Sequence, residues 1–123
     1  KELWEVLNNL GAPTERNRGT FSGYEVDGMP NNSVLVSSGN ITRAQIVQRT
    51  AEGEVIRCTM ENQMDNLNYQ VFTSVQSLGQ YESDNNIAQI VWKTRSTTQF
   101  DIFIEEIEGG TQNLKIHISV KQL

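Results

Sequence analysis

The sequence predicts an α+β fold dominated by an antiparallel β-meander, with a short N-terminal helix and, in the favoured interpretation, one central helix. From residue 19 onward, turn-forming residues recur about every 8 to 14 residues, and Val, Ile, Thr, Phe and Tyr fill the segments between them. Residues 2–13 and 60–78 instead show helical spacing of their apolar side chains. The alternative is a nearly all-β barrel or sandwich, which applies if the central segment is a strand.

The N-terminal segment 2–13 has the features of a short helix. Its apolar stripe consists of Leu3, Val6, Leu7 and Leu10. Gly11 and Pro13 follow the stripe and end the helix. A helix of about ten residues is marginal on its own, so this stripe is expected to dock on the rest of the domain.

Residues 41–50 fit two structures. A strand here would pair with residues 55–60 as a hairpin, whereas Thr42 and Gln45 could also form the capping box of a helix that stops at Gly53. The hairpin is favoured because Ile, Val and Thr crowd the segment.

Residues 60–78 are ambiguous in the same way. Their helical stripe consists of Met60, Met64, Leu67, Val71, Val75 and Leu78. This spacing favours a helix, although the segment also contains several Asn, Thr and Ser residues, which are weak helix formers. The alternative is a strand over residues 68–77, with Tyr69, Val71, Thr73 and Val75 on one face.

The C-terminal third alternates apolar and polar residues over three segments. The apolar faces consist of Ala88, Ile90 and Trp92, then Phe100, Ile102 and Ile104, then Leu114, Ile116, Ile118 and Val120. Three-residue loops at 96–98 and 109–111 would make these segments a meander that keeps the apolar faces together. This register pairs Trp92 with Ile102 and Ile102 with Ile118. It also sets Lys93 beside Asp101 and Lys115 beside Glu105.

Length and charge narrow the classes of protein that the chain can represent. The 123 residues are expected to form a single domain over positions 1–123. Ten basic residues against 15 acidic ones give a net charge of −5. This acidic balance predicts a soluble protein and argues against nucleic-acid binding, which usually relies on a basic surplus. No apolar run reaches the length of a membrane span, so membrane insertion is not expected.

The residues that could carry chemistry are few and scattered. His117 is the only histidine and Cys58 the only cysteine, so neither a His-rich nor a Cys-based metal site can be built. Cys58 lies among apolar neighbours and is expected to be buried. The acidic run of Glu105, Glu106 and Glu108 is interpreted as a solubilising surface. We therefore predict no catalytic residues, no metal and no cofactor, and favour a protein that is not an enzyme.

The predicted meander places one apolar row, Val91, Phe103 and His117, on its outer face. Either a helix of this domain covers the row or the row is an exposed stripe that marks a partner site. The leading functional prediction is thus a non-catalytic binding or assembly module that contacts another protein or a second copy of itself. The alternative is a small-ligand carrier or cavity enzyme on a curved antiparallel sheet, with Asp101 as base. Its pocket would use side chains from Trp92, Tyr69, Tyr81 or Met64.

Overall fold

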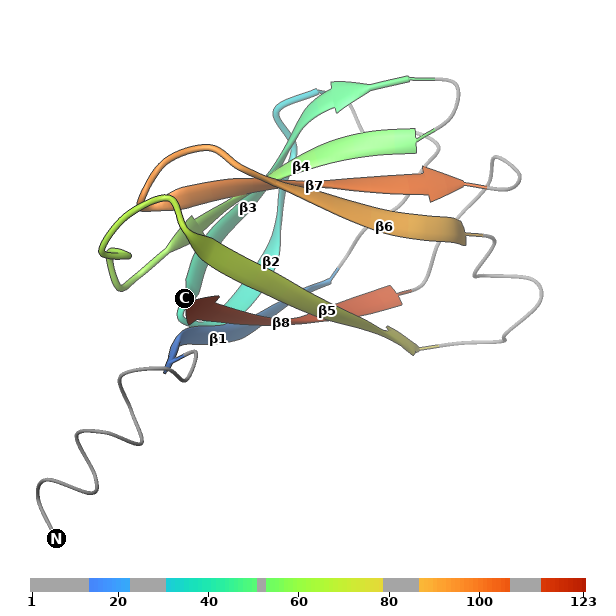
Figure 1. The fold of residues 1–123 in the computed structure, drawn as a ribbon. Coiled ribbons are helices and arrows are strands. Elements are labelled where there is room, and N and C mark those ends of the chain that lie inside the picture. The colour runs from blue at the N-terminus through green and yellow to red at the C-terminus, as the bar shows by residue number, and fades with distance from the viewer. Residues whose placement is uncertain (1–13, 23–30, 51–52, 79–86, 107–113) are drawn as a thin grey trace, which may run out of the picture.

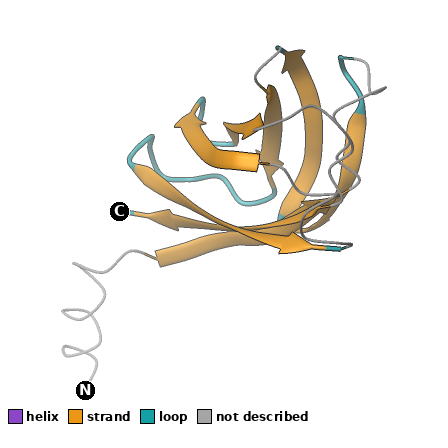
Figure 2. Ribbon diagram, turned by 90° about the vertical axis from the view of Figure 1, so that its right-hand side faces the viewer, coloured by secondary structure: helices purple, strands orange, loops and turns teal. Residues whose placement is uncertain are grey.

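In the computed structural model, which describes residues 14–22, 31–50, 53–78, 87–106 and 114–123, every regular element is a β-strand. The strands are β1 (Thr14–Ser22), β2 (Val34–Gly39), β3 (Ile41–Arg49), β4 (Gly53–Met60), β5 (Tyr69–Ser77), β6 (Ile87–Thr94), β7 (Gln99–Glu106) and β8 (Leu114–Gln122). All eight pair antiparallel and curve into a nearly closed barrel (Figures 1 and 2). The α+β prediction is therefore wrong, and the all-β alternative is correct. The predicted helix over 2–13 lies outside the described residues.

The strand order is β5-β8-β1-β2-β3-β4-β7-β6. Strand β2 changes partner along its length: Val34 and Leu35 pair with β3, whereas residues 36–39 pair with β1. It therefore forms the corner between two halves of the barrel, β5-β8-β1-β2 and β2-β3-β4-β7-β6. Strand switching of this kind is how a curved sheet encloses a core.

One face of each strand points into the barrel and fills it. Most inward side chains are less than 5% exposed and form one cluster. Its largest fully buried members are Phe21, Phe100, Ile41, Ile46, Ile56, Met64, Ile102, Ile104, Leu114 and Ile116. Burial of this apolar area is the main favourable term for folding. The predicted inward faces of β7 and β8 are confirmed.

The predicted hairpin of residues 41–50 with 55–60 is also confirmed. Strands β3 and β4 pair antiparallel, with Ala44 opposite Cys58 and Ile46 opposite Ile56. Cys58 is fully buried, as predicted. Burial in this apolar layer raises the pKa of its thiol far above the ordinary value, so the sulfur stays protonated at neutral pH.

The helix expected over residues 60–78 is wrong. Residues 61–68 form an irregular connection, and β5 follows with Tyr69 and Val71 buried, as the strand alternative required. The Asn side chains explain why the helical spacing did not decide the structure. The backbone amide of Asn68 donates to Oδ1 of Asn66 at 2.8 Å, a local bond that competes with helical hydrogen bonds.

The connection 61–68 closes one end of the barrel through two buried amide side chains. Asn17 of β1 donates from Nδ2 to the carbonyl oxygen of Asn62 at 2.9 Å and accepts its backbone amide at 3.0 Å. Gln122 of β8 accepts the amide of Asp65 at 2.7 Å and donates to the carbonyl oxygen of Asn68 at 2.8 Å. These bonds satisfy polar groups that the barrel end would otherwise bury unpaired.

The predicted C-terminal meander is half correct. Strands β6 and β7 pair in the predicted register, with Trp92 opposite Ile102 and Lys93 opposite Asp101. The β7–β8 hairpin is wrong, because β7 pairs with β4, and β8 lies between β1 and β5. Alternation specifies which face of a strand is buried but not which strand lies beside it. The proposed pair of Glu105 with Lys115 is wrong for the same reason.

The barrel is fastened between β5 and the β6–β7 turn, on the side opposite the β2 corner. The Tyr69 hydroxyl lies 2.8 Å from the carbonyl oxygen of Ser96 and 2.9 Å from that of Gln99, and donates to both. The backbone amide of Met64 donates to the carbonyl oxygen of Thr97 at 2.8 Å. These bonds join the two ends of the strand order, β5 and β6, where the described residues form no β-ladder.

We expect Ile116→Ala to lower the free energy of unfolding by roughly 2–5 kcal/mol, because Ile116 is fully buried between Phe21 and Val75. Lys115→Ala, on the outer face of the same strand, should cost less than about 1 kcal/mol. Urea denaturation of both variants measures the difference. Equal losses would contradict the inward orientation of β8.

Candidate functional site

The structure separates the three residues of the predicted outer row. Val91 and Phe103 are direct neighbours on β6 and β7, and Val55 of β4 extends their row. Val91 is 47% exposed and Phe103 is half-buried. His117 lies instead on β8, in the other half of the barrel, between Thr20 and Ser74. The row of three therefore does not form, because it required the β7–β8 hairpin.

The side chains proposed to line an internal cavity serve other purposes. Tyr69 and Met64 are buried parts of the core, and Trp92 packs against it. Asp101 lies on the outer face, where its Oδ1 accepts a hydrogen bond from Nε of Arg57 at 3.0 Å. Tyr81 lies outside the described residues. These side chains thus stabilise the barrel and its surface rather than surround a ligand space.

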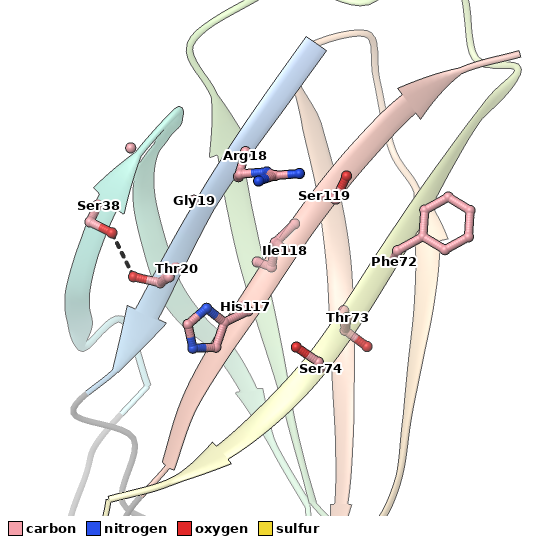
Figure 3. A pocket seen from close by; sticks show the side chains of 11 residues that line it. Arg18, Gly19, Thr20, Ser38, Phe72, Thr73, Ser74, His117, Ile118 and Ser119 are labelled. Atoms are coloured by element: carbon pink, nitrogen blue, oxygen red, sulfur yellow. Dashed lines mark hydrogen bonds between the residues drawn. The ribbon is translucent and has the colours of Figure 1, made fainter. Parts of the chain in front are cut away.

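The described residues form a hollow on the outer face of β2, β1, β8 and β5 (Figure 3). It has a volume of about 540 Å³, within the usual range of small-molecule sites. We call it the outer groove, and it is lined by Arg18, Gly19, Thr20, Ser38, Gly39, Phe72, Thr73, Ser74, His117, Ile118 and Ser119. Antiparallel pairing brings these segments together from four regions of the chain.

The edge of the groove at β1 and β2 depends on two facing glycines. Gly19 pairs with Gly39, and a Cβ at Gly19 would lie 2.2 Å from the carbonyl oxygen of Ser38. Gly39 has a φ of +65°, in the left-handed region that favours glycine. Larger residues at these two positions would push β1 and β2 apart, so the shape of the groove requires glycine here.

Arg18 is held in place through its backbone. Its amide donates to Oδ1 of Asn40 at 3.0 Å, and its carbonyl oxygen accepts the amide of Asn40 at 2.8 Å. The turn between β2 and β3 therefore clamps β1 at this residue. The side chain remains 75% exposed and reaches towards Ser119 of β8 (Figure 3).

Glu15 connects Arg18 to β8. Its Oε2 accepts hydrogen bonds from Nε and Nη2 of Arg18 at 3.2 and 3.0 Å, and also from the hydroxyl of Ser119. The Ser119 hydroxyl, and after it the Arg18 guanidinium, lower the pKa of Glu15 below its ordinary value. Glu15 is consequently ionised at neutral pH, and its carboxylate orients the guanidinium along the groove.

Hydroxyl and imidazole groups also line the outer groove, beside Arg18. The hydroxyls of Thr20 and Ser38 are 2.5 Å apart, a hydrogen bond across β1 and β2 (Figure 3). Nε2 of His117 lies 2.7 Å from Oε1 of Gln76. Because a carbonyl oxygen only accepts, Nε2 carries the hydrogen, and Nδ1 is the ring nitrogen left for other contacts.

Phe72 supplies an apolar wall at the β5 side of the groove. Its side chain projects outward from β5 and is 47% exposed. The ammonium nitrogen of Lys121 lies 5.1 Å from the ring centroid, a cation–π distance. An exposed aromatic ring beside polar groups is a typical feature of small-molecule sites.

The groove has the donors and acceptors of a binding site but not the relay of a hydrolase. A serine nucleophile needs a histidine base that is itself oriented by a carboxylate. In the groove, His117 bonds the amide of Gln76, whereas Glu15 bonds Ser119 directly. Within the described residues, no three His, Cys, Asp or Glu side chains gather as a metal site would need. That part of the chain also contains no helix long and apolar enough to cross a membrane.

Sequence reasoning identified only one member of the groove, His117. Arg18 and Ser119 are far apart in the chain and share no motif, so only the β1–β8 pairing reveals that they meet. The Ser-Gly-Asn sequence at 38–40 is a local signal that predicts a turn. Its contact with Gly19 could not be read from the turn itself.

Comparisons with protein-family models, with curated proteins and with solved structures find no match for this chain.

We expect the contribution of Glu15 to the free energy of unfolding to depend on pH. Because folding lowers the pKa of Glu15, its contribution is present above its ordinary pKa and is lost as the pH falls through the folded value. The exposed site limits the effect to less than about 1 kcal/mol. Urea denaturation between neutral and acidic pH should show a smaller loss in Glu15→Gln than in the unmodified protein. Parallel pH profiles would contradict the bonds described for this carboxylate.

Proposed function

We propose that the protein binds a small molecule in the outer groove, as a carrier or ligand-sensing domain. The observation that carries this proposal is the groove itself, in which a clamped arginine, a histidine, several hydroxyls and an exposed phenylalanine line about 540 Å³. The filled barrel supports an outer rather than an inner site, because fully buried Phe21, Phe100 and Ile102 occupy the interior.

The backbone that builds the groove also holds its polar groups in place. Gly39 adopts a left-handed conformation, and the facing Gly19 allows a close backbone approach. The Asn40 clamp then fixes the position of Arg18. A site whose polar groups are positioned before binding loses less entropy when a ligand arrives.

The experiment is a titration of ¹⁵N-labelled protein, followed by NMR, with a panel of small compounds. The panel contains neutral sugars, neutral aromatics, carboxylates and phosphates. We expect at least one class to shift the backbone amides of Gly19, Gly39 and Ile118, which line the groove. The amide of Ile56, which lies in the core on β4, is the internal control.

Two outcomes would contradict the proposal. One is a panel in which no compound shifts the groove amides. The other is saturable binding that moves amides on β4 and β7 while Gly19 and Ile118 stay unchanged, since it would place the ligand elsewhere on the barrel.

The predicted role in protein–protein contact stays a prediction. Of its three residues, Val91 and Phe103 still share an apolar row on the outer face of β6 and β7. His117, the third residue, belongs to the outer groove and is included in the present proposal instead.

A further inference from the structure

The outer face that carries the groove has a charge opposite to that of the chain. The whole protein has a net charge of −5. On the outer face of β5-β8-β1-β2, the fixed charges are Arg18, Lys115 and Lys121 against Glu15 alone. The outward residues of β2 and β5 add no charge: Val34, Val36 and Ser38 on β2, and Gln70, Phe72, Ser74 and Gln76 on β5.

The neighbouring charges do not cancel this surplus. Arg16, at the bulge of β1, forms a two-pronged ion pair with Asp65 at 2.5 and 2.7 Å, so this pair is neutral as a unit. Of the described acidic residues near the groove, Glu15 is already engaged by Arg18 and Ser119, and Glu61 accepts a hydrogen bond from Nδ2 of Asn40 at 3.4 Å. The three cations Arg18, Lys115 and Lys121 still outnumber these two carboxylates. The described groove therefore presents a positive local potential within an acidic protein.

Arg18 keeps hydrogen-bond donors for a ligand after pairing with Glu15. A guanidinium has five N–H donors, and Glu15 uses one on Nε and one on Nη2. Three donors remain on an exposed side chain that lines the groove. Guanidinium groups bind carboxylate and phosphate oxygens with favourable geometry, so an oxyanion is the natural partner for these donors.

The hydroxyl pair adds a further donor on the same side of the groove. Thr20 and Ser38 share one hydrogen bond, which leaves one of their two hydroxyl hydrogens for another acceptor. Thr20 also lies beside His117 in the β1–β8 register. Arg18 lies two positions along the same strand, and its side chain points towards β8 whereas the Thr20 hydroxyl points towards Ser38 (Figure 3), so the hydroxyl pair is a second donor group beside the guanidinium.

Phe72 indicates that the ligand also has an apolar part. Phe72 on β5 and Arg18 on β1 both pair with Ser119 of β8, which lies between these two strands. An apolar side chain and a cation therefore flank the same residue from opposite sides. A ligand that joins an oxyanion to an apolar or aromatic body would contact both.

We infer that the outer groove is selective for a small molecule with an oxyanion, either phosphate or carboxylate, bound by Arg18, and with an apolar portion against Phe72. This inference rests on the proposed function of the groove and specifies the ligand class. The inference also gives Glu15 two opposing effects on binding. Its carboxylate orients Arg18, and its negative charge repels the anionic ligand.

Three matched probes test the inference: phenyl phosphate, benzoate and neutral benzyl alcohol. Their dissociation constants are measured by NMR titration of the full chain. We expect the two anions to bind in the groove and benzyl alcohol to bind at least about tenfold more weakly. The two anion arms distinguish a phosphate site from a carboxylate site. Raising NaCl from about 0.1 M to about 1 M should weaken anion binding, since the contacts are exposed.

Two variants and one control assign the effect to Arg18. Arg18→Gln should weaken the binding of both anions about tenfold or more, whereas Arg43→Gln, an exposed arginine on β3, should leave it unchanged. Glu15→Gln should tighten binding about two- to fivefold, because it removes a repelling charge beside Arg18 and keeps a carbonyl oxygen that can still orient the guanidinium. A variant that merely loosened the fold would not bind more tightly.

The inference and the underlying function fail in different ways. If benzyl alcohol or a neutral sugar shifts the groove amides and binds as tightly as the two anions or more tightly, the groove binds ligands but is not an oxyanion site. Anion binding that is equal in Arg18→Gln and the unmodified protein, or weaker in Glu15→Gln, also overturns the inference. If no probe and no panel compound shifts the groove amides, the proposed function fails as well.

Discussion

The fold depends on closing two sheets around one apolar core, although the β-ladders of the described residues join the sheets along only one side. On that side β2 pairs first with β3 and then with β1, and the Gly19–Gly39 contact permits the close approach. On the opposite side, the Tyr69 hydroxyl and the connection 61–68 take the place of a ladder. Each strand contributes inward side chains to the core between the two sheets. A change at either side of the barrel therefore alters the packing of the whole core.

This closure determines where a ligand can bind. An eight-stranded barrel is just wide enough to be filled by its own side chains or to hold one small ligand. Here Phe21, Phe100 and Ile102 belong to a filled interior, and polar groups gather on the outer face beside the β2 corner. The same turn at Gly39 and Asn40 that makes the corner also clamps Arg18. The construction of the fold and that of the site therefore share one local structure.

The sequence predicts local properties well and long-range ones poorly, for a physical reason. The alternation of apolar and polar residues correctly identified the inward faces of β7 and β8 and the pairing of Trp92 with Ile102. These features depend only on which side chains of a single strand or a short hairpin are buried. The alternation could not show that β8 leaves β7 and inserts between β1 and β5, because many pairings bury the same side chains. The central helix was mispredicted since Asn side chains and tertiary packing outweighed helical spacing. The outer groove was the least predictable feature, because its residues meet only through those long-range strand pairings.

The most direct test of the central claim is a crystal structure of the protein in complex with phenyl phosphate. The account predicts density for the phosphate within hydrogen-bond distance of Arg18, with the phenyl ring against Phe72 and the interior of the barrel unchanged. Phenyl phosphate bound inside the barrel, or bound on the outer face of β6 and β7, would contradict it.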